Sequence, residues 1–544
     1  MTGGFWRKNG WKNGLRIGVT THFGPLWWVL RRTPRVRSLV NRTLINRLIY
    51  TMPTRPLGLS TLADYRSWPG LTDRRWSARH LSEDPVLQEP PPEVGDVTEL
   101  FRRPGAGGKV SPKSTLLFPH FAQWFVDGFL RTDPRNVRKN KSTHDIDLSQ
   151  LYGQTHTTTK ILRYGAAGKG QLASQFINGQ EFPPHYFGED GKVRSEYKNL
   201  EIVFPGSDKI ANLPFEDPKT GIPLVEFDLS QKEKLFALGI ARGNIHYGLV
   251  MMSTLFLREH NRVARLIAAE NPDWDDDRVF ETTRNTLIVV LLKVVIEDYI
   301  NHITPIRFKL FAESGIGVRE KWYRQNWMSV EFNLLYRWHT MIPSRMRVGG
   351  KDRDVKDVLW DNDLVTSNGL AALFDEASKQ PCNAIGLLNT DPSMLEIEGK
   401  SIGVGRTTKL ASYNDYRVRC GYPRLISFED LSSNPTVREA LRRCYGHIDK
   451  VELYPGLFAE DIRKGGLLPT LMATMVAVDA FSQSLTNPLL APGIFHEETF
   501  SAAGMGVIRS TSTLAQIVKR NIPGEAPNPR VDFNQERRSF PWRR

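Results

Sequence analysis

Residues 331–343, EFNLLYRWHTMIP, place a tyrosine (Tyr336) three positions before a histidine (His339). The apolar residues of this run recur at helical spacing, so we expect one helix whose tyrosine and histidine leave the same face about one turn apart. An imidazole can ligate a haem iron, and a phenol held nearby can give an electron to that group. The alternative is a core helix in which Tyr336 and Trp338 pack and His339 satisfies a hydrogen bond.

The composition is that of a large globular protein. The chain has 544 residues, 40% of them hydrophobic and 24% charged, and no Pro/Gly/Ser linker or charge block divides it. We therefore expect one large catalytic unit over residues 61–544. The cysteines Cys382, Cys420 and Cys444 are odd in number and far apart, which favours neither a disulfide framework nor a zinc site and fits a reducing compartment.

Residues 1–60 carry much of the net charge of +14. Residues 25–50 interleave tryptophans and branched aliphatics with arginines: Arg31, Arg32, Arg35, Arg37, Arg42 and Arg47. Val36, Val40, Leu44 and Leu48 recur every four residues and predict one apolar helical face. Such a basic amphipathic segment suits the surface of an anionic membrane, and the alternative is a basic helix docked on the protein body. We expect no nucleic-acid partner, because no binding module accompanies the charge.

No apolar run reaches the roughly 18 residues of a membrane-spanning helix, and the N-terminus lacks a secretory signal pattern. We therefore expect a cytoplasmic protein, soluble or attached peripherally to a membrane. Helical patterns cover residues 234–271, 278–300, 467–485 and 507–521, whereas 89–112 and 204–224 have the composition of loops. Strands do not alternate with helices, so the predicted fold class is mainly α.

Several phrases occur in an order that is known from one enzyme group. They are PHFAQWFVDGFLRTD (119–133), HDIDLSQLYGQT (144–155), LFLREHNRVARLI (255–267), VVIEDYINHI (294–303), the run around His339, SYNDYRVR (412–419) and YGHIDKVELYPGLFAED (445–461). From about residue 65 to 521 the chain thus resembles the cyclooxygenases (prostaglandin-endoperoxide synthases) and the fungal fatty-acid dioxygenases of the animal-type haem peroxidase superfamily. The resemblance implies a single large helical domain of the animal haem peroxidase fold.

The same resemblance implies roles for residues near His339. His339 would be the proximal ligand of a haem b iron, and Tyr454 would hold its second ring nitrogen directly or through water. Tyr336 would carry a radical that abstracts hydrogen from an unsaturated fatty acid before O2 adds, with peroxide as the activator. Trp338 and Phe332 would shape the wall of the neighbouring apolar channel.

On the distal side the chain departs from the family pattern. The FAQ phrase ends at Gln123, and Asp127 stands four residues later where the family has a proton-moving histidine. A carboxylate can accept a proton, but it is shorter than an imidazole. Counted back from LREHN, Arg242 falls where the superfamily's peroxidases have a peroxide-polarising arginine, and His246 follows one expected turn later on the same face.

Two further residues match substrate-binding positions of the family. Arg55 is the nearest match to the arginine that binds the fatty-acid carboxylate, and Ser482 matches the acylatable channel serine, with Ser484 as the alternative. Three functions stay open on the sequence. They are a haem-dependent fatty-acid dioxygenase, a haem peroxidase that oxidises small donors, and a non-catalytic haem protein.

Overall fold

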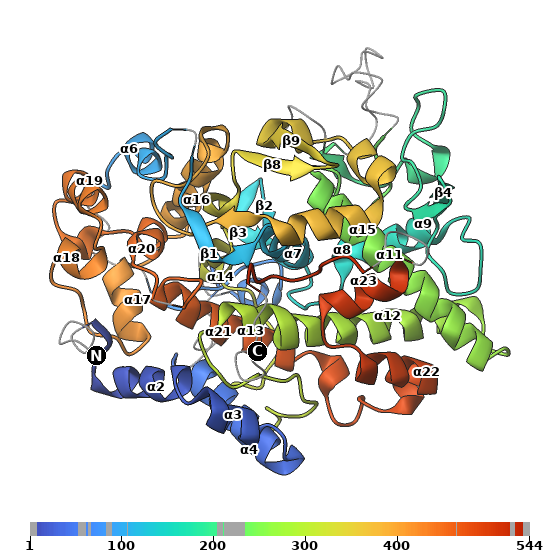
Figure 1. The fold of residues 1–544 in the computed structure, drawn as a ribbon, viewed down its shortest axis with the longest axis horizontal. Helices are drawn as coiled ribbons and strands as arrows, with labels where there is room; N and C mark the ends of the chain where they lie inside the picture. The colour runs from blue at the N-terminus through green and yellow to red at the C-terminus, as the bar shows by residue number, and fades with distance from the viewer. Residues whose placement is uncertain are drawn as a thin grey trace.

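In the computed structural model, the described residues are 8–52, 61–63, 67–82, 90–105, 107–203, 210–211, 234–463, 465–522 and 528–536. The prediction of a mainly α fold is confirmed (Figure 1). The α-helices in this part of the chain are α2 (Trp11–Thr21), α3 (Gly24–Leu30), α4 (Pro34–Ile49), α5 (Trp68–Thr72), α6 (Val94–Glu99), α7 (Leu117–Val126), α8 (Ser149–Tyr152), α9 (His156–Arg163), α11 (Tyr247–Glu270), α12 (Asp276–Val294), α13 (Asn301–Ile303), α14 (Val330–Leu335), α15 (Asp363–Lys379), α16 (Leu395–Thr407), α17 (Tyr413–Arg419), α18 (Phe428–Leu431), α19 (Pro435–Tyr445), α20 (Leu453–Ala459), α21 (Thr470–Leu485), α22 (Glu497–Ser510) and α23 (Leu514–Asn521).

The strands are short and pair two by two, all antiparallel. The pairs are β1 (Val110–Thr115) with β10 (Pro381–Asn383), β2 (Thr132–Asp133) with β3 (Asn136–Asn140), β4 (Gln175–Ile177) with β5 (Gln180–Phe182), β6 (Ile202–Val203) with β7 (Ile210–Ala211), and β8 (Arg345–Val348) with β9 (Lys351–Asp354). The described strands form no larger sheet, so helix packing builds the core.

Two long helices, α11 and α12, run through the centre of the molecule (Figure 1). Nearly every residue in the first half of α11 is buried, which is typical of a helix surrounded by protein. The side chain of Asp275 caps α12, and Asp276 and Asp277 complement the helix dipole in its first turn. α11 packs against α7 and α12, and α12 packs against α22. These helices hold the segment that carries the distal residues.

Two of the predicted helices have different boundaries in the structure. The helix expected over 234–271 begins only at Tyr247, because Asn244 exchanges hydrogen bonds of 2.9 Å with the backbone N–H and C=O of Phe236 and closes a compact loop. The helix expected over 507–521 is interrupted at residues 511–513, where Thr513 caps α23. α12 continues through a π-helical turn at Val295–Ile300 into α13, close to the predicted 278–300. The predicted loop at 89–112 contains α6, and most of 204–224 lies outside the described residues.

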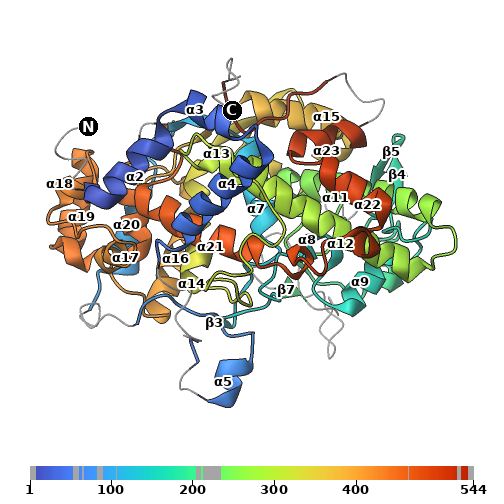
Figure 2. The same ribbon diagram turned by 90° about the horizontal axis from the view of Figure 1, so that it is seen from below.

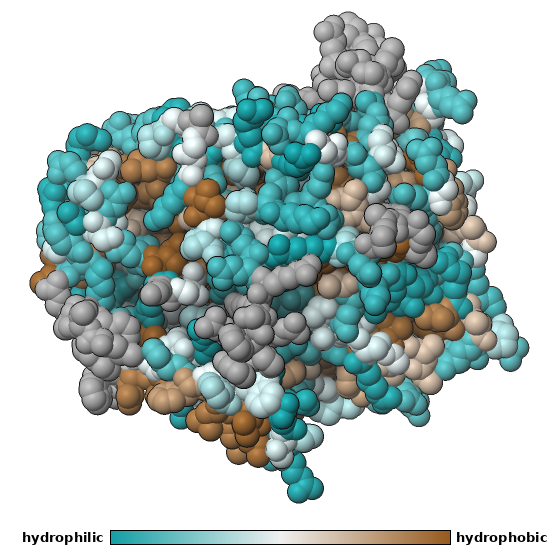
Figure 3. Space-filling model, in the orientation of Figure 1, coloured by the Kyte–Doolittle hydropathy of each residue, from teal (hydrophilic) through white to brown (hydrophobic). Residues whose placement is uncertain are grey.

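The basic segment forms α2, α3 and α4. Of the predicted apolar face of α4, Leu44 is buried and Val36, Val40 and Leu48 are half-buried. Ile45 and Ile49, which were not predicted, are also buried, and α4 lies over α21 (Figure 2). α4 is therefore docked, as in the second alternative for this segment. The exposed apolar side chains belong mainly to α2, α3 and the link between them: Leu15, Val19, Phe23, Leu26 and Val29. Figure 3 shows an apolar area at the lower edge of the molecule, over the N-terminal helices.

Cys382, Cys420 and Cys444 are all free thiols. Within the part of the chain that the structure describes, no helix has the length and apolar character needed to cross a membrane. The predicted boundary at residue 60 lies outside the described residues, so the division into 1–60 and 61–544 stays a prediction.

Candidate active site

The segment around His339 is not the single helix that its spacing predicts. α14 ends at Leu335, Tyr336 and Trp338 have non-helical backbone angles, and a separate 3₁₀ turn begins at His339. Tyr336 and His339 therefore do not lie one turn apart on one helical face. Several aromatic residues with modest helix propensity fall at the break, and Trp338 gains ring contacts there with Phe118 and Tyr336, at centroid distances of 5.7 and 4.9 Å.

The hydroxyl of Tyr336 is buried and has no hydrogen-bond partner among the described residues. Phe332 meets its ring edge-on at 5.1 Å, and Trp338 stacks on it. Burial, and then the negative charge of Asp479 on α21, raise the pKa of Tyr336 above its usual value. The phenol is thus kept neutral and is fixed by rings rather than by hydrogen bonds.

The side chain of His339 is 22% exposed, although its neighbours are buried. Its Nδ1 is buried and lies 3.4 Å from Oε1 of Glu398, a fully buried residue of α16. Tyr454 does not contact this ring directly. Its hydroxyl donates to Oε2 of Glu398 at 2.5 Å, so the carboxylate stands between the tyrosine and the histidine.

The distal residues meet at the end of α7. Gln123 and Asp127 lie one turn apart there, and Oε1 of Gln123 is 2.9 Å from Nε2 of His246. His246 is the N-cap of α11 rather than a residue inside a helix, so the expectation that Arg242 and His246 share a helical face is wrong. The compact loop before α11 nevertheless brings both residues to the distal group. Burial lowers the pKa of His246 to about 4, which keeps the imidazole neutral.

Asp127 is the acid of this group, and its Oδ2 is buried without a hydrogen-bond partner in the described chain. Burial raises its pKa to about 6, against the opposing charges of Arg242, Arg131 and Arg337. Three guanidinium groups thus face one carboxylate. Arg337 also interacts electrostatically with Tyr454 and Glu398, so it lies at the edge between the distal group and the His339 side.

The predicted substrate-binding residues have different outcomes. Phe332 lies beside Tyr336, as described above, and α14 packs against α21, which carries Ser482. The Ser482 hydroxyl donates to the backbone carbonyl of Val478 at 2.6 Å within its own helix, whereas Oγ of Ser484 is buried without a partner in the described chain. Arg55 lies outside the described residues.

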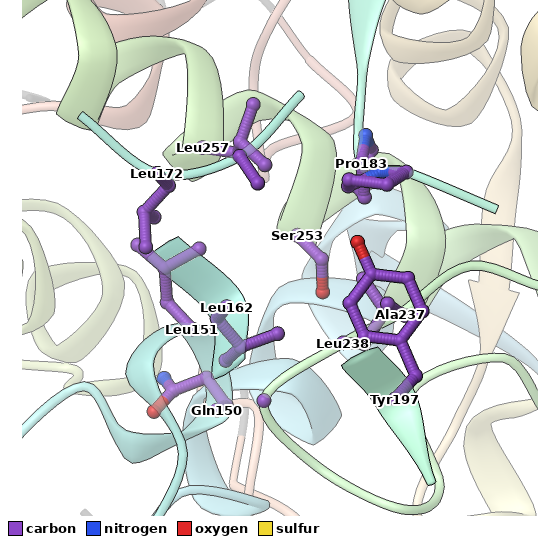
Figure 4. Close-up of a pocket in the computed structure, with 13 residues that line it drawn as sticks. Gln150, Leu151, Leu162, Leu172, Pro183, Tyr197, Ala237, Leu238, Ser253 and Leu257 are labelled. Atoms are coloured by element: carbon purple, nitrogen blue, oxygen red, sulfur yellow. The ribbon is translucent and has the colours of Figure 1, made fainter. Parts of the chain in front are cut away.

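Three hollows in the described part of the chain are lined by residues other than His339. One, of about 710 Å³, opens widely to the surface beside Phe495 and Arg509. The other two are more enclosed. The first, lined by leucines together with Gln150, Tyr197 and Ser253, has a volume of about 20 Å³ (Figure 4). That is room for about one water molecule, so it can hold neither a haem nor a lipid chain. The second, of about 370 Å³, opens beside Arg131 and has polar walls that include Lys198 and Glu201. Its lining suits charged or polar groups rather than a hydrocarbon tail.

The residues around His339 fit a haem. An imidazole with one nitrogen held near a carboxylate and an open ring edge is the usual arrangement of a metal-ligating histidine. Arg131, Arg242 and Arg337 face Asp127, and Arg131 also faces Glu201 while Arg337 faces Glu398. Guanidinium groups are suitable partners for the propionates of a haem. The buried acceptor Oδ2 of Asp127 leaves a place for a protonated ligand on the distal side.

The sequence reasoning missed four residues of this site. Glu398 could have been recognised from the sequence, because it is a charged residue on the buried stripe of α16. It lies there between Leu395 and Ile402, at a position where an apolar residue is normal. Asp479 likewise occupies a buried face of an apolar helix, α21. Arg131 and Arg337 carry no comparable signal, since an arginine in a loop is ordinarily a surface residue.

Comparison with known proteins places this geometry in a family. A family model described as animal haem peroxidase matches residues 111–531. Prostaglandin G/H synthase 2 of Equus caballus is 29% identical over 523 residues, which cover 93% of this chain and 80% of that protein. Fatty acid alpha-dioxygenase of Oryza sativa has a similar fold, with a TM-score of 0.66 at 16% identity, covering 96% of this chain and 98% of that one. Peroxidase A of Dictyostelium discoideum gives a TM-score of 0.60 at 17% identity, covering 89% and 97%. Because the matched stretch includes both the distal segment and the segment around His339, the chain belongs to the animal haem peroxidase family.

Proposed function

We propose that this protein is a haem-dependent fatty-acid oxygenase (dioxygenase) in which Tyr336 removes a hydrogen atom from an unsaturated fatty acid before O2 adds. The observation that carries the proposal is the Tyr336 hydroxyl, which is buried, has no hydrogen-bond partner in the described chain and lies in the segment that leads to His339. The names of the similar proteins, a prostaglandin G/H synthase and a fatty acid alpha-dioxygenase, support a lipid substrate.

As a member of its family the chain is an oxidoreductase that binds haem iron. We propose haem b, with His339 as the iron ligand and with Arg131, Arg242 and Arg337 facing the propionates. When bound, the haem supplies a one-electron oxidant. The chain's own contribution is to hold Tyr336 beside that oxidant, between the rings of Phe332 and Trp338.

The chemistry at Tyr336 is a hydrogen-atom transfer. One electron of Tyr336 goes to the oxidant that the bound haem would supply, and the phenolic proton goes to water. The Tyr336 oxygen then takes a hydrogen atom from an allylic carbon, so an O–H bond forms and a C–H bond breaks. O2 adds to the carbon radical, and the resulting peroxyl radical takes the hydrogen atom back from Tyr336. The product is a hydroperoxide, and the tyrosyl radical is restored. No hydrogen bond has to break at the Tyr336 hydroxyl for the substrate to approach.

The distal group prepares the site for peroxide. Asp127 can accept its proton, and Arg242 supplies positive charge near Asp127. His246 accepts the Gly248 N–H at Nδ1 and faces Oε1 of Gln123 at Nε2, so it can take the proton only after one of these bonds opens. This group supports a catalytic protein over a non-catalytic haem protein. It also supports a second candidate function, a peroxidase that oxidises small donors, because that activity needs the distal group but not Tyr336.

The N-terminal helices support attachment to an anionic membrane surface. Phe23, Leu26 and Val29 are exposed on or beside α3, and Arg31 and Arg32 follow at its end. Apolar side chains beside arginines suit the boundary between lipid headgroups and acyl chains. In this proposal Arg55 and Ser482 keep their predicted roles as substrate-binding residues.

The test is Tyr336→Phe in the haem-loaded protein, with oxygen uptake measured on C18 and C20 unsaturated fatty acids. We expect uptake to fall to background while the haem absorption spectrum is kept, because phenylalanine cannot form the radical. Tyr413→Phe, which changes a buried phenol of α17, is the matched control and should retain activity. Persistent oxygenation by Tyr336→Phe would refute the role of Tyr336. Peroxide-dependent dye oxidation by the wild-type protein without lipid oxygenation would favour the peroxidase.

A further inference from the structure

Glu398 is fully buried and directs one carboxylate oxygen toward the proposed iron ligand. Its Oε1 accepts a hydrogen bond from the Thr390 hydroxyl at 2.8 Å and lies 3.4 Å from Nδ1 of His339. Its Oε2 accepts from the hydroxyl of Tyr454 at 2.5 Å. α16 packs against both α14 and α20, so three elements fix the carboxylate in this place.

A hydrogen bond between Glu398 and His339 would satisfy a need on both sides. A buried carboxylate is costly unless polar donors surround it, and the two hydroxyls alone leave part of its acceptor capacity unused. Nδ1 of His339 is itself buried, and no hydrogen bond reaches it from the described residues. When Nε2 binds a metal, the remaining proton of the imidazole is on Nδ1 and faces Glu398.

We infer that Glu398 is a positioning residue that accepts the Nδ1–H of His339 and gives the imidazole anionic character. This inference rests on the proposed function only in that His339 ligates the haem iron. A more anionic imidazole donates more electron density and stabilises the ferric iron over the ferrous iron. Thr390 and Tyr454 limit the effect, because their hydrogen bonds withdraw charge from the same carboxylate.

The first measurement is the midpoint reduction potential of the haem-loaded protein, together with the iron–histidine stretching frequency of its ferrous form. In Glu398→Gln we expect the potential to rise, with the ferrous-to-ferric ratio at a fixed ambient potential increasing about tenfold, which is about 59 mV for one electron. The iron–histidine frequency should fall. Glu331→Gln is the control, since Glu331 is also fully buried and hydrogen-bonded, to Tyr416 at 2.6 Å, and should change neither quantity.

A second variant has the opposite expected sign. Thr390→Val keeps the shape of the side chain and removes one donor from Oε1, so Glu398 should accept more strongly and the potential should fall below that of the wild type. A purely structural role for Glu398 would not give shifts of opposite sign. An unchanged potential and frequency in both variants would overturn the inference, whether or not Glu398→Gln folds well.

The outcome can be separated from that of the proposed function. If His339→Ala binds haem with the wild-type spectrum, His339 is not the ligand and the inference falls with that assignment. If the potentials shift as expected while the wild-type protein oxygenates no fatty acid, the role of Glu398 stands and the fatty-acid oxygenase is wrong.

Discussion

Asp127 and His246 are the two candidates for taking the proton of peroxide, and their pKa values differ. Burial raises the pKa of Asp127 to about 6 and lowers that of His246 to about 4. A carboxyl with a raised pKa binds its proton below about pH 6 and can no longer act as a base there. If Asp127 is the base, we expect the rate of the peroxide reaction, followed by stopped-flow absorption of the haem, to fall tenfold per pH unit below about pH 6.

The variants decide between the two residues. Asp127→Asn should then slow the reaction about hundredfold at pH 7 and abolish the dependence near pH 6, because the amide cannot accept the proton. His246→Gln should have a smaller effect and keep that dependence. The opposite result would be a wild-type rate that does not change with pH down to pH 5, together with a large loss of rate in His246→Gln. That result would show that the histidine takes the proton of peroxide.

The crossing of α7 and α11 holds these groups in place, and it depends on a glycine. A Cβ at Gly248 would lie 2.6 Å from Nδ1 of His120 and 3.0 Å from Cε1 of His246. The His120 ring cannot easily move, because its Nε2 is 2.8 Å from the Tyr247 hydroxyl. Gly248→Ala should therefore destabilise the protein by about 1–3 kcal/mol in urea unfolding.

The control is Gly506→Ala in α22, where the added Cβ meets nothing. This substitution should instead stabilise the protein by up to about 1 kcal/mol. Equal stabilisation by both substitutions would show that the crossing tolerates a side chain.

The elements also show what local patterns can predict. The buried stripes of α11, α12 and α21 were recognisable because long apolar helices carry a strong periodic signal. The break between Tyr336 and His339 was not, since it depends on ring contacts with Phe118 from a distant part of the chain. The phrase that contains both residues thus misled about their geometry, while the roles of Tyr336 and His339 stay a prediction. The place of Glu398 on the buried stripe of α16 could be recognised, but its partner could not, because His339 is far away in sequence.

At the level of the molecule, α21 links the site with the apolar N-terminal surface. α21 carries Asp479, whose charge acts on Tyr336, and also Ser482, and α4 lies over α21 (Figure 2). The docked face of α4 thus fixes α2 and α3 relative to the interior. A lipid substrate taken from a membrane at that surface would have to travel only from the N-terminal helices past α21 to reach Tyr336.

This arrangement predicts binding to anionic vesicles. The wild-type protein should sediment with vesicles that contain phosphatidylserine and less with pure phosphatidylcholine, and added salt should weaken the binding because the arginine contribution is screened. Replacing Phe23, Leu26 and Val29 together by serine should abolish sedimentation and leave the unfolding curve unchanged, since all three are exposed. Phe176→Ser, at an exposed apolar residue of β4, controls for general loss of surface hydrophobicity. If the triple variant sediments like the wild type, the apolar surface of α2 and α3 does not attach this protein to membranes.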